Sequence, residues 1–396
     1  MATDVLYYLS HGAKGIAKAF HDKYSGNVIV KQEIRRERMS VVDGIMDINW
    51  SPDGKYIATA DRVNNVTIWN PRTGEKIYEL LKKHKEYVSC VRFSPDGKFI
   101  ATGSHDGTCK VWSLGDKKLK KIHDYKHGEE VHTLCWSPTG DRLAVGGYNV
   151  SVGSEPIKIW NLHIRRIVMK MIHDLHDVYC LRWQPANDFS LWETIASSSC
   201  AGNTLKLWRV KHGDCLHTFV HDDYVTDFVW APDASRIVTA CHDWSITIWD
   251  VIDGLCILQM YHDHWALSVA WSHDMTRIAS GGADMSLQVW NAETGDLIRK
   301  KQYPFQINTV EFSPDDEVIA FSSRYSTEKL AKPWRSRVHL QKAPAMVYHD
   351  ENEIEKAPSY NSNSISSRGS TAKTSLTGGT MSRPGTVGSN KKITSP

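Results

Sequence analysis

The chain has 396 residues, of which 41% are hydrophobic and 23% are charged, so it can fill a sizeable core and keep a polar surface. Its formal net charge of +3 is too small to indicate a nucleic-acid-binding protein. No apolar run reaches the roughly 18 residues of a membrane span, and the N-terminus lacks the layout of a secretory signal. We therefore expect a cytoplasmic protein, with a nuclear or cytoskeletal location as the alternative.

The eight cysteines give no sign of a metal or redox site. None of them forms a C-x-x-C pair, which is the spacing typical of zinc and thioredoxin-like sites. Most fall within predicted strands, as small buried hydrophobic residues do in a reducing compartment. The sequence thus predicts no metal ligands and no cofactor.

The N-terminal segment, residues 1–25, is predicted to be a helical arm or cap. Apolar residues recur at spacings of three and four over Asp4–Tyr24, which is typical of an amphipathic helix. Packing on the rest of the chain is the simpler interpretation, and a partner-binding or membrane-surface helix is the alternative. After it, Gly26–Ile34 resembles an isolated strand.

Six short β-branched runs, each ending in tryptophan, then recur every 41 to 48 residues, which indicates a repeat architecture. In one repeat, strands are predicted at His84–Phe93, Lys98–Ser104, Cys109–Ser113 and Lys118–Tyr125. The first turn, Ser94–Gly97, suits a type I turn. Four strands with turns at fixed offsets make one blade of a β-propeller. Two repeats are lengthened by insertions, at Tyr148–Glu155 and at Ala186–Glu193, that are confined to turns.

The all-β propeller is predicted over residues 26–343, with seven blades or alternatively six. A seventh unit begins at Ile307, and Ser336–Lys342 can supply its third strand. Because an open ring exposes unpaired strand edges, we expect Asn27–Glu33 to close it as the outer strand of the last blade. Residues 344–396 are rich in Ser, Thr and Gly and predict a disordered tail. From Arg324 onward the chain has about twelve Lys and Arg against about five Asp and Glu, so the tail is basic.

These repeats resemble the WD-repeat family of β-propellers, because spacing, turn motif and terminal tryptophan recur together. The resemblance implies a hydrogen-bonded chain of His, Ser or Thr, Asp and Trp within a blade. The matching residues are His84, Thr102, Asp106 and Trp112; His221, Thr239, Asp243 and Trp249; and His262, Ser280, Asp284 and Trp290. The first, third and fourth repeats depart from this pattern. Since an active site is needed only once, repetition favours a structural role over a hydrolase triad.

The resemblance also implies a binding face where loops meet over the central channel. The matching positions carry large aromatic, histidine or methionine side chains, which are Tyr87, His105, Tyr224, His242, Trp244, Trp265 and Met285. Such side chains are typical interface anchors. We therefore expect a non-enzymatic interaction scaffold that binds other proteins, as part of a multiprotein complex.

Three other functions stay open from the sequence. The basic tail is compatible with an adaptor that binds microtubules or another acidic polymer. Trp69–Arg72, with the sequence WNPR, is similar to the W-D-x-R signature of substrate receptors of cullin ubiquitin ligases, except that Asn70 replaces Asp. An enzyme is the third, but no residue of the sequence is a candidate for catalysis.

Overall fold

The computed structural model describes residues 40–41, 44–115, 118–148, 156–173, 177–186, 193–199, 202–324 and 336–345. All of these residues lie in the first of two compact units, Met1–Met346, and the second unit, Val347–Pro396, holds no described residue. The described residues form strands and turns without a helix, so they contain no apolar helix able to span a membrane. The helix expected over Asp4–Tyr24 and nearly all of the expected tail lie outside the described residues.

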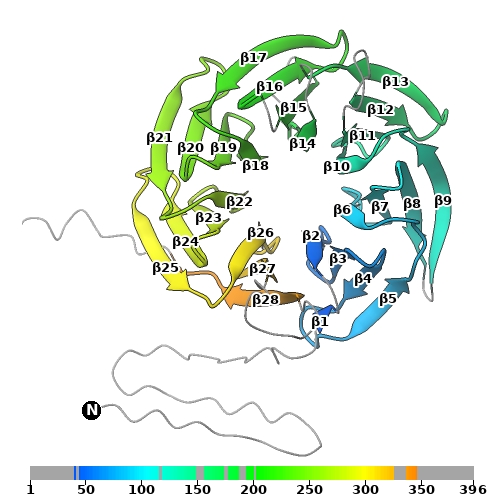
Figure 1. The fold of residues 1–396 in the computed structure, drawn as a ribbon, viewed down its shortest axis with the longest axis horizontal. Helices are drawn as coiled ribbons and strands as arrows, with labels where there is room; N and C mark the ends of the chain where they lie inside the picture. The colour runs from blue at the N-terminus through cyan, green and yellow to red at the C-terminus, as the bar shows by residue number, and fades with distance from the viewer. Residues whose placement is uncertain are drawn as a thin grey trace, which may run out of the picture. The chain divides into compact units, whose positions relative to one another are not determined.

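Seven four-stranded antiparallel sheets, called blades 1 to 7, form a ring (Figure 1). Blade 1 contains β2 (Ile45–Trp50), β3 (Ile57–Asp61), β4 (Val66–Trp69) and β5 (Lys76–Leu80); blade 2 contains β6 (Val88–Phe93), β7 (Phe99–Ser104), β8 (Thr108–Leu114) and β9 (Leu119–Lys126). Blade 3 contains β10 (Val131–Trp136), β11 (Arg142–Gly147), β12 (Ile157–Asn161) and β13 (Arg166–Met171); blade 4 contains β14 (Val178–Trp183), β15 (Thr194–Ser199), β16 (Thr204–Arg209) and β17 (Asp214–Val220). Blade 5 contains β18 (Val225–Trp230), β19 (Arg236–Cys241), β20 (Ser245–Asp250) and β21 (Cys256–Tyr261); blade 6 contains β22 (Ala266–Trp271), β23 (Arg277–Gly282), β24 (Ser286–Asn291) and β25 (Leu297–Gln302). Blade 7 contains β26 (Gln306–Phe312), β27 (Val318–Arg324), β28 (Ser336–Lys342) and β1 (Ser40–Val41).

Blade 7 closes the ring with a strand from the N-terminal side of the chain. Its outer strand is Ser40–Val41, which pairs antiparallel with the predicted third strand, Ser336–Lys342. Closure by an N-terminal strand is thus confirmed, but the residues expected for it were wrong. Asn27–Glu33 lies outside the described residues, and Ser40–Val41 takes the outer position. The six-bladed alternative is also wrong.

Burial explains why the sequence pattern changes across each blade. The three inner strands are almost fully covered on both faces, whereas outer strands such as β5 and β13 alternate exposed and partly buried residues. Hydrophobic clusters fill all seven interfaces between neighbouring blades, as where Ile68 of blade 1 packs with Val91 and Ile100 of blade 2. A blade therefore depends on its neighbours for its core.

The predicted S-P-D-G turn owes its shape to side chains that bond to its own backbone. In Ser94–Gly97, the Ser94 hydroxyl accepts a hydrogen bond from the Phe99 amide at 2.9 Å and donates to the Asp96 carboxylate at 2.6 Å. Gly97 has a φ of 68°, in the left-handed region where glycine fits without strain. These contacts explain why Ser, Asp and Gly recur at fixed places in the repeats.

The His–Ser/Thr–Asp–Trp chain is complete in blades 2 and 6. In blade 2, the two ring nitrogens of His84 contact Asp106 at 3.1 Å and the Thr102 hydroxyl at 2.8 Å. The Trp112 indole N–H donates to the same hydroxyl at 3.1 Å. Burial lowers the pKa of His84 to about 4, so its imidazole is neutral at pH 7. In blade 6 the chain is made by His262, Ser280, Asp284 and Trp290.

Two blades differ from the expected pattern. In blade 5, His221 and Trp249 both bond to Thr239, but the Nδ1 atom of His221 has no partner among the described residues, so the link expected from Asp243 is not made. Blade 4, expected to lack the chain, keeps most of it: Ser197 bonds both His173, at 2.6 Å, and Trp208. Thr204 contacts the other nitrogen of His173, at 3.1 Å, and so takes the place of the missing aspartate.

Candidate functional site

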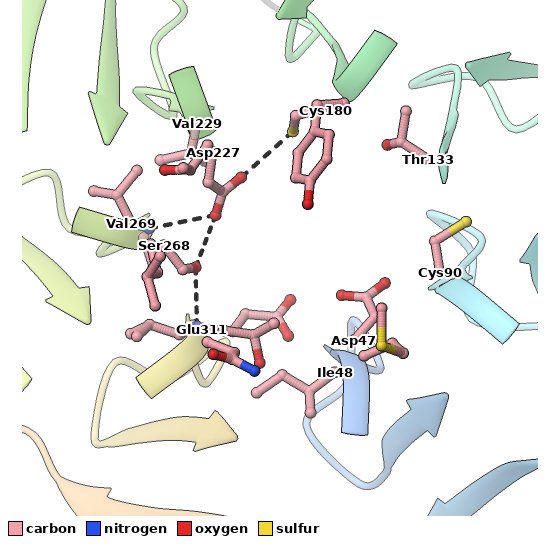
Figure 2. Close-up of a pocket in the computed structure, with 18 of the residues that line it drawn as sticks. Asp47, Ile48, Cys90, Thr133, Cys180, Asp227, Val229, Ser268, Val269 and Glu311 are labelled. Carbon is pink, nitrogen blue, oxygen red and sulfur yellow. Dashed lines mark hydrogen bonds between the residues drawn. The ribbon is translucent and has the colours of Figure 1, made fainter. Parts of the chain in front are cut away.

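A central cavity of about 1140 Å³ lies inside the ring and is lined by the first strand of every blade. Figure 2 shows side chains from these strands pointing into it, among them Asp47, Cys90, Asp227 and Glu311. Each first strand has a β-bulge near its start, and consecutive residues such as His132 and Thr133 of β10 line the cavity. Several residues of the cavity wall, among them Ile48, Cys90 and Cys180, also belong to the hydrophobic clusters between blades.

Carboxylates in the cavity wall join one blade to the next. Asp47 of blade 1 forms an ion pair with Arg92 and accepts a hydrogen bond from the Val91 amide at 2.9 Å, both in blade 2. At the equivalent place, Asp227 of blade 5 accepts a bond from the Ser268 hydroxyl of blade 6 at 2.8 Å (Figure 2). Since both carboxylates already have partners, they act as links between blades.

Glu311 makes the corresponding link between blade 7 and blade 1. Its two carboxyl oxygens accept hydrogen bonds from the Asn49 side-chain amide at 2.8 Å and from the Trp50 backbone amide at 2.9 Å. Loss of water around the carboxyl raises the pKa of Glu311 to about 8, although the nearby Arg92 favours the charged form. The carboxyl group of Glu311, with a pKa of about 8, therefore links the last blade of the ring to the first.

We expect Glu311 to make stability depend on pH. The folded chain keeps a proton on this carboxyl up to a pKa of about 8, whereas the unfolded chain releases it near the ordinary value of 4.5. The stabilisation is therefore complete below 4.5 and is lost as the pH rises towards 8. From about pH 5 to about pH 9, the free energy of unfolding should fall by at least ~1.4 kcal/mol more in the wild type than in Glu311→Gln.

Urea unfolding of both proteins at the two pH values measures this difference. Glu317→Gln is the matched control, because Glu317 is an exposed residue of the same blade. Parallel pH profiles for the wild type and Glu311→Gln would contradict the assignment.

Two clusters of aromatic and histidine rings lie at the rim of the cavity. The blade 2–4 cluster comprises Tyr87, His105, His132, Tyr148 and Tyr179, with ring centroids of neighbouring members 3.9 to 6.2 Å apart. The blade 5–6 cluster comprises Tyr224, His242, Trp244, His264 and Trp265, with neighbouring centroids 4.6 to 6.1 Å apart. Most members come from the loops before the first strands or from the turns after the second strands, whereas His132 and Tyr179 lie within the first strands β10 and β14.

The blade 5–6 cluster exposes a large aromatic surface. Tyr224, Trp244 and Trp265 are 44%, 47% and 43% exposed, although His242 stacks on Trp265 at 4.6 Å with an interplanar angle of 12°. Stacking holds these rings in place while it leaves one side of each open to solvent. Rigid, half-exposed aromatic side chains are suited to burial against another molecule.

Comparison with protein families supports the architecture. The profile described as WD domain, G-beta repeat (WD40) matches residues 40–70, 74–113, 118–149, 169–209, 213–250 and 255–291, which together are more than half of the chain. The chain belongs to the WD-repeat family. A search of curated proteins found no match to this WD-repeat chain.

The seven rim residues predicted for this WD-repeat propeller divide into three groups. His105, Tyr224, His242 and Trp265 line the cavity. Tyr87 and Trp244 lie behind them, stacked on His105 at 3.9 Å and on His264 at 6.1 Å. Met285 is 42% exposed in the β23–β24 turn and is not among the residues that line the cavity.

Four members of the clusters were not predicted from the sequence: His132, Tyr148, Tyr179 and His264. His132 and Tyr179 are the second residues of β10 and β14, and only residues in the loops and turns were considered as candidates. In both strands the third residue, Thr133 or Cys180, also lines the cavity, because a β-bulge at the second residue breaks the alternation of side chains. Alternation in the sequence therefore gives no sign of His132 or Tyr179.

Acidic residues accompany the blade 5–6 cluster. Asp222 and Asp263 are exposed in the loops that lead to β18 and β22, two residues before Tyr224 and one residue before His264, and Asp263 forms an ion pair with Lys300 at 2.6 Å. The Tyr224 backbone amide donates a hydrogen bond to the Asp223 carboxylate at 2.8 Å. Burial lowers the pKa of the His242 imidazole, and the negative charge of Asp223 offsets part of this lowering. Carboxylates next to exposed aromatic faces give this part of the WD-repeat ring both hydrophobic and anionic character.

Proposed function

We propose that this protein is a non-enzymatic interaction scaffold that binds segments of partner proteins on the rim of the propeller cavity. WD-repeat propellers commonly bind other proteins, and the observation that carries the proposal here is the blade 5–6 cluster. We place the protein in a multiprotein complex in the cytoplasm, with Tyr87, His105, Tyr224, His242, Trp244, Trp265 and Met285 as the partner-binding set and Tyr224 and Trp265 as its centre.

The charge of this surface favours a partner segment that contains Lys or Arg. Cations bind over the faces of Trp and Tyr, and this attraction adds to that of a nearby carboxylate. Asp222 and Asp223 supply such carboxylates beside Tyr224. An acidic segment would instead meet charges of its own sign, which costs affinity.

Chemistry inside the cavity supports binding rather than catalysis. Burial raises the pKa values of the Cys90 and Cys180 thiols to about 12, so both stay protonated at neutral pH and are poor nucleophiles. Asp47 and Asp227 already have partners that join blades. These thiols and carboxylates of the cavity wall are therefore not candidate nucleophiles.

The two other binding functions gain no support from particular contacts. The microtubule-adaptor function depends on the basic tail, nearly all of which lies outside the described residues. In the WNPR segment, Trp69 is fully buried and donates its indole N–H to Thr59 at 3.0 Å, which is a structural role. The Asn70 side chain accepts a bond from the Arg72 amide at 2.9 Å and so shapes the turn.

Selection from a random peptide library tests the proposed chemistry of the partner. We expect peptides enriched on the wild type to contain Lys or Arg, and Asp222→Asn/Asp223→Asn to weaken their binding most at low salt, where charges are least screened. Asp253→Asn is the matched control, because Asp253 is exposed in the β20–β21 turn at the opposite end of blade 5. Enrichment of acidic peptides, or equal binding by all three proteins, would contradict the proposed chemistry.

A further inference from the structure

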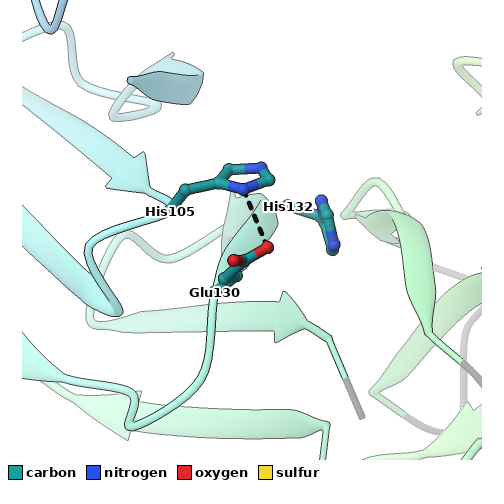
Figure 3. Close-up of side chains that lie close together, drawn as sticks. All are labelled: His105, Glu130 and His132. Carbon is teal, nitrogen blue, oxygen red and sulfur yellow. Dashed lines mark ion pairs between the residues drawn. The ribbon is translucent and has the colours of Figure 1, made fainter. Parts of the chain in front are cut away.

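Three potential metal ligands meet where blade 2 adjoins blade 3. His105 comes from the β7–β8 turn, Glu130 precedes β10, and His132 is in β10 (Figure 3). One ligand atom from each residue lies within 4.8 Å of the other two. The closest pair is His105 Nδ1 and a Glu130 carboxylate oxygen, at 2.9 Å.

The fold holds His105 and His132 in place and brings Glu130 next to them. The His105 ring stacks on Tyr87 with centroids 3.9 Å apart, and the His105 backbone amide donates to the Tyr87 carbonyl at 3.2 Å. Glu130 and His132 flank Val131, which is fully buried in the core between blades 2 and 3. Glu130 and His132 lie on the same side of this segment, close to His105 (Figure 3).

The electrostatic setting suits neutral imidazole ligands. Loss of water by burial lowers the pKa of His105, and burial together with the charge of His105 lowers that of His132. Neutral imidazole is the form that binds metals. No hydrogen bond to another described residue engages a ring nitrogen of His132, so its lone pair is available.

We propose that His105, Glu130 and His132 bind a zinc ion. Two imidazoles and one carboxylate are a donor set of open zinc sites, in which water or a further ligand takes the fourth position. Ca²⁺ and Mg²⁺ fit less well because they prefer oxygen ligands. Zinc–ligand distances of about 2.0–2.2 Å require ligand atoms roughly 3.3 Å apart, so the 4.8 Å arrangement must contract. The Glu130 side chain is 51% exposed and can turn inward.

The site extends beyond the proposed scaffold function. A zinc ion held there would join the β7–β8 turn of blade 2 to β10 of blade 3, and its open position would face solvent at the cavity rim. No metal ligands were predicted from the sequence, because the cysteines lack the C-x-x-C spacing of a zinc site. His105 and Glu130 are 25 residues apart in the chain, and only the packing of two blades brings them together.

Zinc titration by isothermal calorimetry, using the full chain and the variants His132→Ala, Glu130→Gln and His242→Ala, tests the site. We expect the wild type to bind one more zinc ion than His132→Ala, and Glu130→Gln to bind it at least about tenfold more weakly. His242 occupies the turn of blade 5 that corresponds to the His105 turn, so His242→Ala is the matched control and should bind zinc like the wild type. Exposed thiols such as Cys215 and Cys256 are present in all four proteins, so any zinc that they bind does not affect the comparison.

Thermal unfolding provides a second readout that does not depend on counting ions. Zinc should raise the melting temperature of the wild type and of His242→Ala, because a ligand that binds only the folded state stabilises it. Glu130→Gln changes an exposed side chain and should fold normally, but at the same zinc concentration its melting temperature should rise less than that of the wild type. Equal zinc binding by the wild type, His132→Ala and Glu130→Gln would overturn the proposal, as would an equal loss in His242→Ala.

Discussion

Replacing Tyr224 and Trp265 together by alanine is expected to lower the affinity for a partner segment by about 30- to 1000-fold. Loss of two central aromatic anchors typically costs about 2–4 kcal/mol of binding free energy or more. Both side chains are more than 40% exposed, so their removal leaves the hydrophobic core unchanged. The dissociation constant of a selected peptide, measured by fluorescence anisotropy, gives the size of the effect.

The control for this prediction is a change of similar size at the other end of the same blade. Ile252 and Leu255 are 79% and 65% exposed in the β20–β21 turn. Ile252→Ala/Leu255→Ala should bind the peptide like the wild type. If both double variants lose affinity equally, or if neither does, the rim of blades 5 and 6 is not the binding surface.

Replacing Thr102 by valine should lower the free energy of unfolding by about 2–4 kcal/mol. The Thr102 hydroxyl contacts both the His84 ring at 2.8 Å and the Trp112 indole at 3.1 Å, and all three groups are buried. Valine has nearly the same shape but no hydroxyl, so two buried polar groups lose their partner at once. Each unsatisfied group costs about 1–3 kcal/mol.

Blade 3 offers the reverse experiment. Val145 occupies the place in β11 that Thr102 has in β7, and the indole N–H of Trp160 is buried without a hydrogen-bond partner. Val145→Thr gives this indole an acceptor and should raise the free energy of unfolding by about 0.5–1.5 kcal/mol. Urea unfolding monitored by circular dichroism measures both variants. If Val145→Thr destabilises as much as Thr102→Val, the hydroxyl is not the source of stability.

The strands that end in tryptophan could be predicted from the sequence because each repeat carries the same local signals. A β-branched run, in most blades a Ser or Thr of the second strand that accepts a bond from the tryptophan, and a turn similar to Ser-Pro-Asp-Gly all favour the same blade. Ser40–Val41 could not be identified in this way. A two-residue strand has no periodicity, and its position depends on its pairing with Ser336–Lys342. That pairing joins the two ends of the propeller and leaves no local pattern.

The residues of the candidate site, too, could be predicted from the sequence only in part. Loop aromatics such as Tyr224 and Trp265 were identified because their places in the repeat are fixed. His132 and Tyr179 were missed, since their importance comes from stacking across blades at 6.0 Å. Blade 4 shows that spacing alone also misleads. Thr204 substitutes for an aspartate that the motif requires, because a hydroxyl at that point can reach His173 equally well.

Quantitative affinity purification from cell extract tests the central claim most directly. It compares the proteins retained by the wild type, by Tyr224→Ala/Trp265→Ala and by Ile252→Ala/Leu255→Ala, each with an unchanged melting temperature. We expect a set of partners that is retained by the wild type and by the β20–β21 variant but lost from the rim variant. Retention of every partner by the rim variant would contradict the account.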